Sequence, residues 1–312
     1  MFLASPITFP NLGITVDPSP VAFTVFGKDI YWYGIIIASG FLLAVLYMLH
    51  RAKDFGVTQD DVLDMILWAV PIGVVCARLY YCIFYWELYE DDPISMLYIW
   101  EGGLAIYGGI IGGVITLLVV AKVKKIPAPV LLDLAGMGVI IGQCIGRWGN
   151  FINREAFGAA TELPWRMRLW TSATTYMDVH PTFLYESLWN VIGLLLLYFV
   201  VSRARRFDGE NTCFYFIWYG LGRFWIEGLR TDSLYLFHWT LFGQRIRVSQ
   251  AVSLVMVLVC TGILIYRLAV KKDDHVRFFP VYYFVAPCLI GTVAQNLHYG
   301  ISTGWLCVAL AF

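Results

Sequence analysis

Long apolar runs decide what this chain can fold into. The sequence contains seven of them, at 33–50, 65–86, 104–121, 130–147, 182–201, 211–228 and 249–270. An apolar run of roughly 18 residues or more is long enough to cross the hydrocarbon core of a bilayer as a helix. The sequence therefore predicts an all-α integral membrane protein with about seven transmembrane helices.

The composition agrees with a membrane location. Of the 312 residues, 59% are hydrophobic and only 14% are charged. Soluble domains usually carry about 25% charged residues, so this chain has too few for an aqueous surface of its size. We expect residues 1–275 to form one polytopic membrane domain and 276–312 to be an apolar C-terminal extension. That extension is broken by "QNLHYG" (295–300) and is either an eighth span or a hairpin in the interface.

Basic residues between the spans predict the orientation of the chain. They follow the first, third, fifth and seventh spans: Arg51, Lys53, Lys122, Lys124, Lys125, Arg203, Arg205, Arg206, Arg267, Lys271 and Lys272. Alternate connections share one side of the membrane, and the side rich in Lys and Arg is cytoplasmic. The N-terminus is therefore predicted to lie outside.

A second group of arginines does not fit this orientation. Eight of them lie at or after the outer ends of the fourth and sixth spans: Arg147, Arg154, Arg166, Arg168, Arg223, Arg230, Arg245 and Arg247. Positive charge on the outer side needs another reason. An anionic substrate bound from the outer leaflet would supply one.

The sixth span carries charges on one helical face. In "LGRFWIEGLR" (221–230), Arg223, Glu227 and Arg230 are spaced i, i+4 and i+7, which places them on the same side of a helix. An arginine in the middle of a span costs roughly 2.5–3.5 kcal/mol. Glu227 neutralises the arginines in part and leaves a net positive stripe. We interpret the stripe as an anion site; the alternative is a structural ion pair at a helix end.

The segment "GRWGNFINREAFG" (146–158) supplies a second set of polar groups. Arg147 ends the fourth span, Asn150 follows one helical turn later, and Asn153, Glu155 and Gly158 come next. A guanidinium grips phosphate oxygens in a planar, two-pronged way that Lys does not copy. Arginines from the fourth and sixth spans are therefore predicted to clamp a phosphodiester. Taken alone, Arg147 is also typical of a side chain that snorkels to the interface.

Two further polar residues interrupt apolar surroundings. Arg78, in "VCARLYYCIF", has no charged neighbour in the sequence, so it either snorkels to the interface or joins the polar interior. His180 precedes Pro181, which suits the first position of a helix. The imidazole either caps that helix or belongs to the site.

Glycines indicate how closely the spans approach one another. "GGLAIYGGIIGG" (102–113) places Gly108 and Gly112 four apart, and the fourth span repeats that spacing at 138, 142 and 146. Small residues four apart let helix backbones pack closely in lipid. The third and fourth spans are therefore predicted neighbours, which would bring Tyr107 near Arg147 as a hydrogen-bond donor or a proton carrier. The glycines at 149 and 158 are predicted to permit a turn.

No cofactor is expected. The seven cysteines are scattered through apolar stretches, with no CxxC pair and no Cys/His cluster, so neither zinc nor a disulfide framework is indicated. Arginines can stabilise charge on a leaving phosphate without a metal. We expect no nucleic-acid partner either.

Taken in order, the polar segments resemble those of bacterial prolipoprotein diacylglyceryl transferases. The longest match is "GQCIGRWGNFINREAFG" (142–158). The flanking pieces follow in the same order: "YWYG" (31–34), "ARLYY" (77–81), "GGLAIYGG" (102–109), "HPTFLYES" (180–187) and "GRFWIEGLR" (222–230). The resemblance covers roughly residues 20–270, and the tail beyond it is longer than the family pattern.

The resemblance implies an activity. Enzymes of this family move the diacylglyceryl group of phosphatidylglycerol to the lipobox cysteine of a prolipoprotein signal peptide. They form a thioether and release glycerol phosphate, which is the first step of lipoprotein maturation. The implied partners are thus phosphatidylglycerol, prolipoproteins and membrane lipid. The implied location is the bacterial cytoplasmic membrane, crossed several times, with the active site toward the outer face.

The resemblance also implies site residues. Arg147 and Arg223 match the family's essential arginines. Together with the residues singled out above, the expected catalytic set is Arg147, Arg223, Tyr107, Asn150 and Glu155. The expected substrate-binding set is Arg147, Tyr33, Arg78, Asn153, Gly158, His180, Glu227 and Arg230. Tyr107 stands where some members have a histidine, which weakens the idea of an obligatory histidine base at this position.

Two rival functions use the same arginines. A transporter for anions or lipids would line its pathway with them, and it would be expected to show inverted, comparable halves, of which the sequence has no sign. A non-catalytic lipid-binding subunit would need the arginines but not the group from Asn150 to Glu155.

Overall fold

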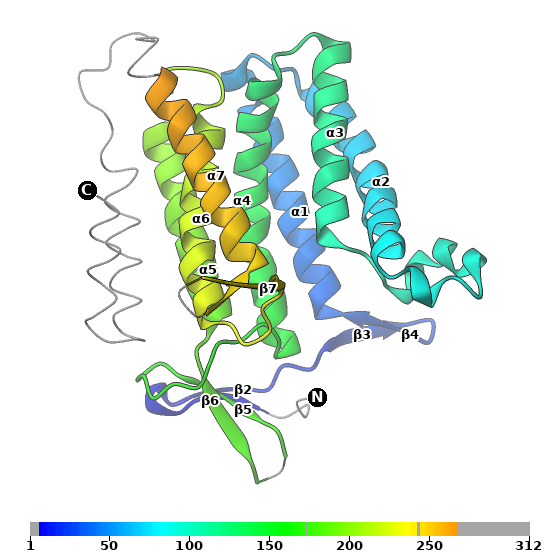
Figure 1. Ribbon diagram of the computed structural model, residues 1–312, viewed down its shortest axis with the longest axis vertical. Helices are drawn as coiled ribbons and strands as arrows, with labels where there is room; N and C mark the ends of the chain where they lie inside the picture. Colours follow the sequence, from blue (N-terminus) through cyan, green and yellow to red (C-terminus); the bar gives the residue numbers. More distant parts are fainter. Residues whose placement is uncertain (1–5, 173, 242–243, 268–312) are drawn as a thin grey trace. The chain divides into compact units, whose positions relative to one another are not determined.

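The seven predicted apolar runs coincide with helices over the residues that the structure describes. The computed structural model describes residues 6–172, 174–241 and 244–267. Within them lie seven α-helices: α1 Trp32–Arg51, α2 Gln59–Phe84, α3 Ile106–Lys124, α4 Ala128–Asn153, α5 Thr182–Leu196, α6 Glu210–Leu229 and α7 Val248–Ile265 (Figure 1). A π-helical turn, Leu197–Val201, continues α5. The prediction of a helical membrane protein is confirmed, although α2 begins earlier than expected and α4 continues to Asn153.

Not every helix is equally apolar. Six helical segments of the described residues are long and apolar enough to cross a membrane: Trp32–Phe55, Gln59–Phe84, Ile106–Lys124, Ala128–Asn153, Thr182–Val201 and Val248–Ile265. Helix α6 is not among these six, because its charged and polar aromatic residues lower its mean hydropathy. The count of seven spans and the outside N-terminus remain predictions. The C-terminal extension, 276–312, lies outside the described residues.

The chain divides into two compact units. The first comprises residues 1–44 and 136–312, and the second comprises residues 45–135. Helices α1 and α4 each contribute one end to each unit.

In the first unit, α1 packs along α4 through small residues. A Cβ added at Gly40 would lie 3.3 Å from Ile145 Cβ, and one added at Gly146 would lie 3.3 Å from Ile37 Cδ1. A methyl group at either glycine would therefore crowd the facing isoleucine. The close approach fixes the C-terminal part of α4, which carries Arg147.

Two tryptophans lock α5 to α6. Trp189 Nε1 donates to the carbonyl oxygen of Trp218 at 2.9 Å, and Trp218 Nε1 donates to the carbonyl oxygen of Trp189 at 2.8 Å. Their rings stack with centroids 4.7 Å apart. Gly193 and Gly222 make room for them, since an added Cβ at either would approach an indole to within 2.4 Å. Helix α7 packs on the other side of α6 (Figure 1).

The sequence analysis did not predict the small sheets of the first unit. A four-stranded antiparallel sheet has the order β2-β1-β5-β6 and is made of Ile14–Val16, Ile7–Phe9, Met167–Trp170 and Tyr176–Val179. Two hairpins add β3 Val21–Val25 with β4 Lys28–Tyr31, and β7 Tyr235–Leu241 with β8 Gln244–Arg247. These strands are too short to give a readable alternation in the sequence. Short 3₁₀ turns complete the described chain at Pro10–Leu12, Ala52–Phe55, Trp86–Leu88, Pro93–Leu97 and Ile99–Glu101.

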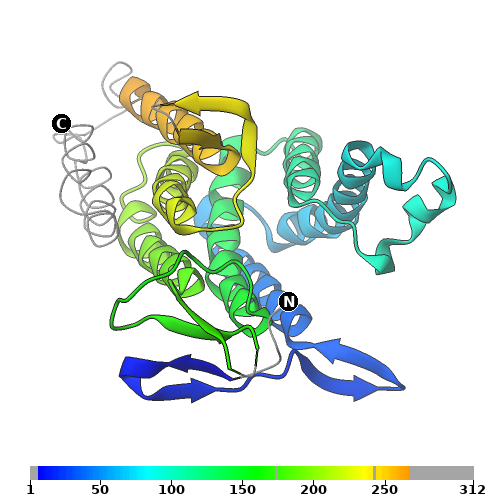
Figure 2. The same ribbon diagram turned by 60° about the horizontal axis from the view of Figure 1, so that its bottom comes forward.

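The four-stranded sheet lies against the ends of α4 and α5 (Figure 2). The rings of Phe151 of α4 and Phe183 of α5 pack in a tilted arrangement with centroids 4.6 Å apart, and they join Ile7, Met167 and Val179 in one apolar cluster. On the strands themselves, Asp178 receives hydrogen bonds from Arg166 and Arg168. These bonds, that from Arg168 first, hold the pKa of the Asp178 carboxyl below its usual value. The sheet therefore anchors the polar segment that links α4 to α5.

In the second unit, α2 and α3 form a close pair. The atoms nearest an added Cβ at Gly108 are Cys76 O, Tyr80 Cβ and Ala77 Cα, all on α2, at 2.3–2.8 Å. At Gly112 the nearest atom is Cys76 Cβ, at 2.8 Å. The glycines of the third span thus face the second span, and the prediction that they pack against the fourth span is wrong. Glycine spacing indicates a close partner but does not say which helix it is.

Arg78 organises the loop between α2 and α3. Its guanidinium donates to the carbonyl oxygens of Ser95, Met96, Gly102 and Gly103, at 2.8, 2.8, 2.7 and 3.1 Å. The group also lies 5.2 Å from the centre of the Tyr89 ring. With at least four of its hydrogens used on carbonyls, Arg78 joins the polar interior as a structural group and does not snorkel.

The tryptophan lock gives a test of packing. We expect Gly222→Ala to displace Trp189, break its bond to the Trp218 carbonyl and destabilise the protein by about 1–3 kcal/mol. The measurement is the midpoint of thermal unfolding of the detergent-solubilised protein. Gly142→Ala is the matched control, because its added Cβ meets nothing within 4 Å. Equal midpoints for both variants would show that the indole pair does not hold α5 to α6.

Candidate active site

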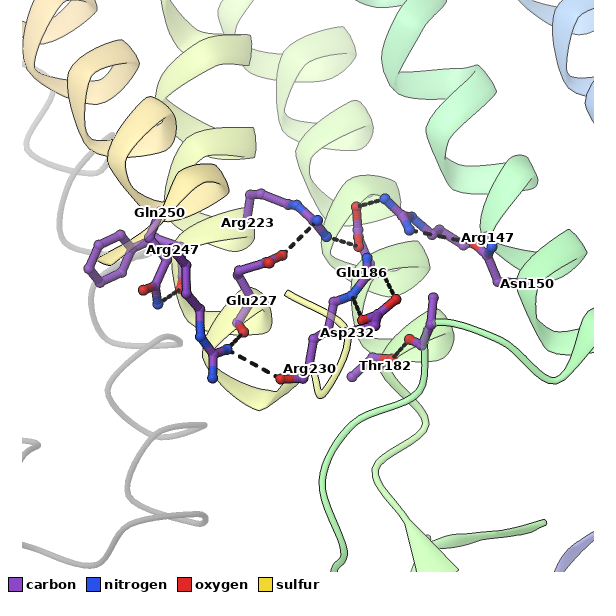
Figure 3. A network of polar contacts seen from close by, with 12 residues as sticks. Arg147, Asn150, Thr182, Glu186, Arg223, Glu227, Arg230, Asp232, Arg247 and Gln250 are labelled. Carbon is purple, nitrogen blue, oxygen red and sulfur yellow. Dashed lines mark hydrogen bonds and ion pairs between the residues drawn. The ribbon is translucent and has the colours of Figure 1, made fainter. Parts of the chain in front are cut away.

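Charged side chains of three helices meet in one chain of ion pairs (Figure 3). Arg147 Nη2 of α4 lies 2.5 Å from Glu186 Oε1 of α5. Arg223 Nη1 of α6 lies 3.3 Å from Glu186 Oε2. Arg223 Nη2 lies 2.6 Å from Glu227 Oε2 on the same helix. The two predicted arginines are thus linked by one carboxylate between them.

The local folding explains this meeting. Helices α4 and α6 both end at the site, and α5 begins there. Glu186 lies near the start of α5 and therefore reaches Arg147. Arg223 and Glu227 are one helical turn apart, the spacing that favours an ion pair on a helix face. Glu186 and Glu227 are only 3% and 2% exposed. A buried carboxylate is costly unless a cation and hydrogen bonds match it, so each glutamate requires its arginine.

Glu186 lies at the centre of these ion pairs, and the sequence analysis did not assign it to the site. Its sequence signal was a carboxylate in the first turns of an apolar span, which needs a positive partner. The partners lie 39 residues before it and 37 residues after it. Carboxylates from outside the stripe on α6 also pair with its arginines: Glu186 with Arg223, and Asp232 with Arg230. Counting Glu186 and Glu227, the pairs around Arg147 and Arg223 balance in formal charge.

The end of α4 carries a second polar group. Asn150 Nδ2 donates to Glu155 Oε1 at 2.8 Å, and Asn153 Nδ2 donates to the same oxygen at 3.5 Å. Arg147 Nη1 donates to Asn150 Oδ1 at 3.4 Å. Asn150 therefore connects the arginine to the carboxylate of Glu155.

The glycines here serve a purpose other than the predicted turn. Gly149 lies inside α4, where an added Cβ would come within 2.7 Å of Tyr33 Cδ2. An added Cβ at Gly158 would come within 2.7 Å of His180 Cβ. At both positions the absence of a side chain lets a neighbouring residue approach the backbone closely. The turn itself is made by Arg154 and Ala156, which have positive φ values of 55°.

The His180 side chain lies beside the first turns of α5, whose N-cap residue is Pro181. His180 Nδ1 lies 3.2 Å from the Tyr185 hydroxyl, which also accepts a hydrogen bond from Trp165 Nε1 at 2.7 Å. The backbone of His180 accepts from Gly158 N at 3.0 Å. His180 and Gly158 thus join the start of α5 to the segment after α4.

The end of α6 is held by groups that the sequence analysis did not assign. Arg247 Nη1 donates to the carbonyl oxygens of Glu227 and Arg230. Gln250 Nε2 donates to the carbonyl oxygen of Phe224 at 3.0 Å (Figure 3). The last carbonyls of a helix have no partner within it, and a cation there is favoured by the helix dipole. Arg247 and Gln250 therefore fix the helix end that carries Arg223.

Arg230 points to a carboxylate of its own. Its Nε and Nη2 donate to the two oxygens of Asp232, at 2.8 and 2.7 Å. These bonds hold the pKa of the Asp232 carboxyl below its usual value. Arg230 is thus engaged by the protein, and it is joined to the rest of the site through Arg247.

Most of the arginines on the predicted outer side have protein partners. Arg166 and Arg168 bind Asp178, and Arg154 donates to the carbonyl oxygens of Ile152 and Pro18. The side chain of Arg245 lies outside the described residues. For the arginines with these partners, an anionic substrate is not needed to explain the charge. Arg147 and Arg223 differ from them because they come from two different helices and share a buried carboxylate, that of Glu186.

The predicted site residues fall into two groups. Within the first unit, contacts connect Arg147, Arg223, Glu227, Asn150, Asn153, Glu155, Arg230, Tyr33, Gly158 and His180 to the ends of α4, α5 and α6. Arg78 and Tyr107 belong to the second unit, where the Tyr107 ring lies 6.3 Å from that of Tyr80. Among the residues that the structure describes, no group of three or more His, Cys, Asp or Glu side chains is placed to hold a metal ion.

The geometry suits an anion with two oxygens. A carboxylate already bridges two guanidinium groups from different helices, and guanidinium forks bind carboxylate and phosphate in the same planar way. A phosphodiester would match the place that Glu186 now fills.

Known proteins resemble the chain over most of its length. The family model described as "Prolipoprotein diacylglyceryl transferase" matches residues 20–266. Relatives named phosphatidylglycerol–prolipoprotein diacylglyceryl transferase include one from Streptococcus agalactiae, 43% identical over 84% of this chain and 99% of its own. Others are from Finegoldia magna, 42% identical over 82% and 98%, and from Listeria monocytogenes, 42% identical over 82% and 92%. The chain belongs to the prolipoprotein diacylglyceryl transferase family.

Proposed function

We propose that this chain transfers the diacylglyceryl group of phosphatidylglycerol to the lipobox cysteine thiol of prolipoproteins. The observation that carries the proposal is the carboxylate of Glu186 held between Arg147 and Arg223. The names of the relatives supply the lipid and the protein substrate.

Binding would proceed by exchange of anions. The phosphodiester takes the forks of Arg147 and Arg223, and the Glu186 carboxylate gives them up. Each guanidinium then faces phosphate oxygens on which charge grows as the bond to carbon breaks. Donors fixed in advance at such a position stabilise a transition state strongly in a low-dielectric site.

The chemistry requires a thiolate and a leaving phosphate. The cysteine sulfur attacks the glycerol carbon that bears the phosphodiester, an S–C bond forms, and the C–O bond to phosphate breaks. Glycerol phosphate departs with the electron pair. The thiol proton must go to a base, because the thiolate is the reactive form. We assign this role to Glu186, which is freed when phosphate takes its arginines.

The remaining residues would orient the substrates. Asn150 and Glu155 hold Arg147 in place and offer polar groups to the glycerol head. The role of Tyr107 as a hydrogen-bond donor to the substrate is kept as a proposal that comes from the sequence analysis. We place the site toward the outer face of the bacterial cytoplasmic membrane, because the basic connections predict that orientation.

A reconstituted reaction tests the proposal. Purified protein, phosphatidylglycerol and a lipobox peptide should give a peptide heavier by one diacylglyceryl group and an equal amount of free glycerol phosphate. A peptide with serine in place of the lipobox cysteine is the control. Lipid movement across vesicles without any change in peptide mass would favour the transporter instead.

Arg147→Lys tests whether the planar fork matters. The variant keeps the charge but loses two-pronged binding, so we expect about a ten- to hundredfold lower kcat/KM, the worth of a charge-assisted hydrogen bond. Arg166→Lys is the control, since Arg166 binds Asp178 on the sheet. A rate for Arg147→Lys within about threefold of wild type, roughly 0.65 kcal/mol, would make bidentate binding the wrong explanation.

Glu186→Gln separates a base from a counter-ion. It preserves the size of the side chain and removes the charge between the two arginines. Loss of a base should lower kcat by about a hundred- to ten-thousandfold. KM for phosphatidylglycerol should not rise, because the Glu186 carboxylate no longer competes with the phosphate for Arg147 and Arg223. The measurement is kcat and KM on protein that elutes as a folded species. A near-normal kcat with a lower KM would leave Glu186 as a counter-ion only.

Tyr107→Phe tests the assigned role of α3. Removing a hydroxyl that bonds to a charged group should cost about 1.5–3 kcal/mol, or roughly ten- to a hundredfold in rate. A larger loss, of about a hundred- to ten-thousandfold, would indicate proton transfer by the phenol. The assay is peptide modification with phosphatidylglycerol. Full activity would remove Tyr107 from the site.

A further inference from the structure

The proposed exchange of anions places a demand on the interior around Glu186. This side chain is 3% exposed and pairs with Arg147 and Arg223 at rest. When a phosphodiester takes those arginines, the carboxylate loses both cations while it is still buried. A buried carboxylate without a partner is strongly destabilised. The displaced Glu186 therefore needs a second polar partner within reach of its side chain.

Asn190 lies in the right place to be that partner. It follows Glu186 by four residues on α5, and residues four apart are neighbours on a helix surface, with about 5–6 Å between their Cβ atoms. Both side chains belong to the buried face of α5, whereas Leu188 and Val191 lie on its exposed face. The Glu186 carboxylate can therefore reach the Asn190 amide by rotating about its own side-chain bonds.

The amide of Asn190 has no partner at rest. The residue is 0% exposed, and neither Nδ2 nor Oδ1 forms a hydrogen bond within the described part of the chain. Native proteins leave few buried polar atoms unpaired, and each such atom calls for an explanation. Ser187 shows the usual behaviour on the same helix face: its hydroxyl donates to the carbonyl oxygen of Cys144 at 2.8 Å and accepts from Trp148 Nε1 at 3.2 Å. Asn190 thus keeps its donors and its acceptor available.

An amide matches both charge states of the displaced glutamate. The Nδ2 hydrogens donate to a carboxylate, and Oδ1 accepts from the hydroxyl of a protonated carboxyl group. We propose that Asn190 is a positioning residue that holds the Glu186 side chain after phosphate has taken Arg147 and Arg223, an inference that rests on the proposed function. The amide keeps the glutamate beside the site, first as the ionised base and then with the thiol proton on it.

This role has effects of opposite sign on lipid binding and on resting stability. Without Asn190 the displaced carboxylate has no second partner, so Glu186 stays on its arginines and competes with the phosphate. The affinity for phosphatidylglycerol should therefore fall. In the lipid-free protein the same amide is buried and unpaired, so its removal should not destabilise the fold. A residue that only supports packing would behave in the opposite way.

Asn190→Leu separates the two effects. Leucine has a similar size and no polar atoms, so we expect the unfolding midpoint of the lipid-free protein in detergent to equal or exceed that of the wild type. The affinity for phosphatidylglycerol is measured without peptide, from the saturable rise of that midpoint with lipid. It should fall about ten- to hundredfold, the worth of a hydrogen bond to a charged group. Asn190→Ala repeats the test if Asn190→Leu does not fold.

Ser187→Ala is the matched control. It removes a polar group of the same helix that already has hydrogen-bond partners in the protein. We expect this variant to lower the unfolding midpoint and to change the affinity for phosphatidylglycerol by less than about threefold.

A double-mutant cycle shows whether Asn190 acts through Glu186. In a Glu186→Met background no carboxylate is left to be held, so the addition of Asn190→Leu should change the lipid affinity by less than about threefold. Glu186→Gln serves as the background if Glu186→Met does not fold. The loss there should be smaller than in the wild type, because a neutral amide gains less from a hydrogen bond than a carboxylate does.

Two outcomes overturn the inference separately from the proposed function. An equal loss of lipid affinity with and without the Glu186 carboxylate would mean that Asn190 contacts the lipid or supports the fold. Wild-type lipid affinity in Asn190→Leu would also overturn it, and a lower midpoint would then point to an amide that a buried water satisfies at rest. Absence of transfer to a lipobox peptide by the folded wild-type protein is a different result, because it would contradict the proposed function itself.

Discussion

The need to match charge in a low-dielectric interior governs the site. Arg147 and Arg223 come from different helices, and burying either guanidinium there without an anion would destabilise the fold. Glu186 serves both, at 2.5 and 3.3 Å, and Glu227 serves Arg223 at 2.6 Å. The ends of α4, α5 and α6 must therefore keep their positions along the helix axes relative to one another. A shift by one residue would leave a buried charge unpaired, at a cost of about 3–5 kcal/mol.

The rest of the first unit keeps those three ends level. Trp189 and Trp218 exchange hydrogen bonds with each other's carbonyls, which prevents α5 from sliding along α6. Arg247 then donates hydrogen bonds to the carbonyl oxygens at the C-terminal end of α6. In the second unit Arg78 does the same for a loop. Arginine thus has two uses in this chain. Some guanidiniums bind carboxylates at the site. Others bind backbone carbonyls, which need a hydrogen-bond partner inside a membrane.

The sequence predicted those features that depend on neighbouring residues. Apolar runs located the seven helices, and the i, i+4 spacing located the pair of Arg223 and Glu227. It did not predict features that depend on partners far apart in the sequence. Glu186 has no charged residue nearby in the sequence, the glycines of α3 indicated close packing but not against which helix, and strands of three to five residues in the sheets around β1 and β3 carry too little pattern to be recognised. Arg78 shows the same limit, since its isolation in sequence hid four carbonyl partners.

A charge-balanced resting site also bears on turnover. Phosphatidylglycerol would bring one negative charge to the arginines, and transfer of the thiol proton to Glu186 would leave the total charge of the site unchanged, because the negative charge moves to the sulfur. Formation of the S–C bond then neutralises the sulfur, and departure of the phosphate puts a second negative charge on the product. Transfer of the proton from Glu186 to that phosphate would leave a singly charged product and an ionised glutamate. The glutamate, ionised again, would compete for Arg147 and Arg223, and the group that admits the substrate would thereby also help to expel the product.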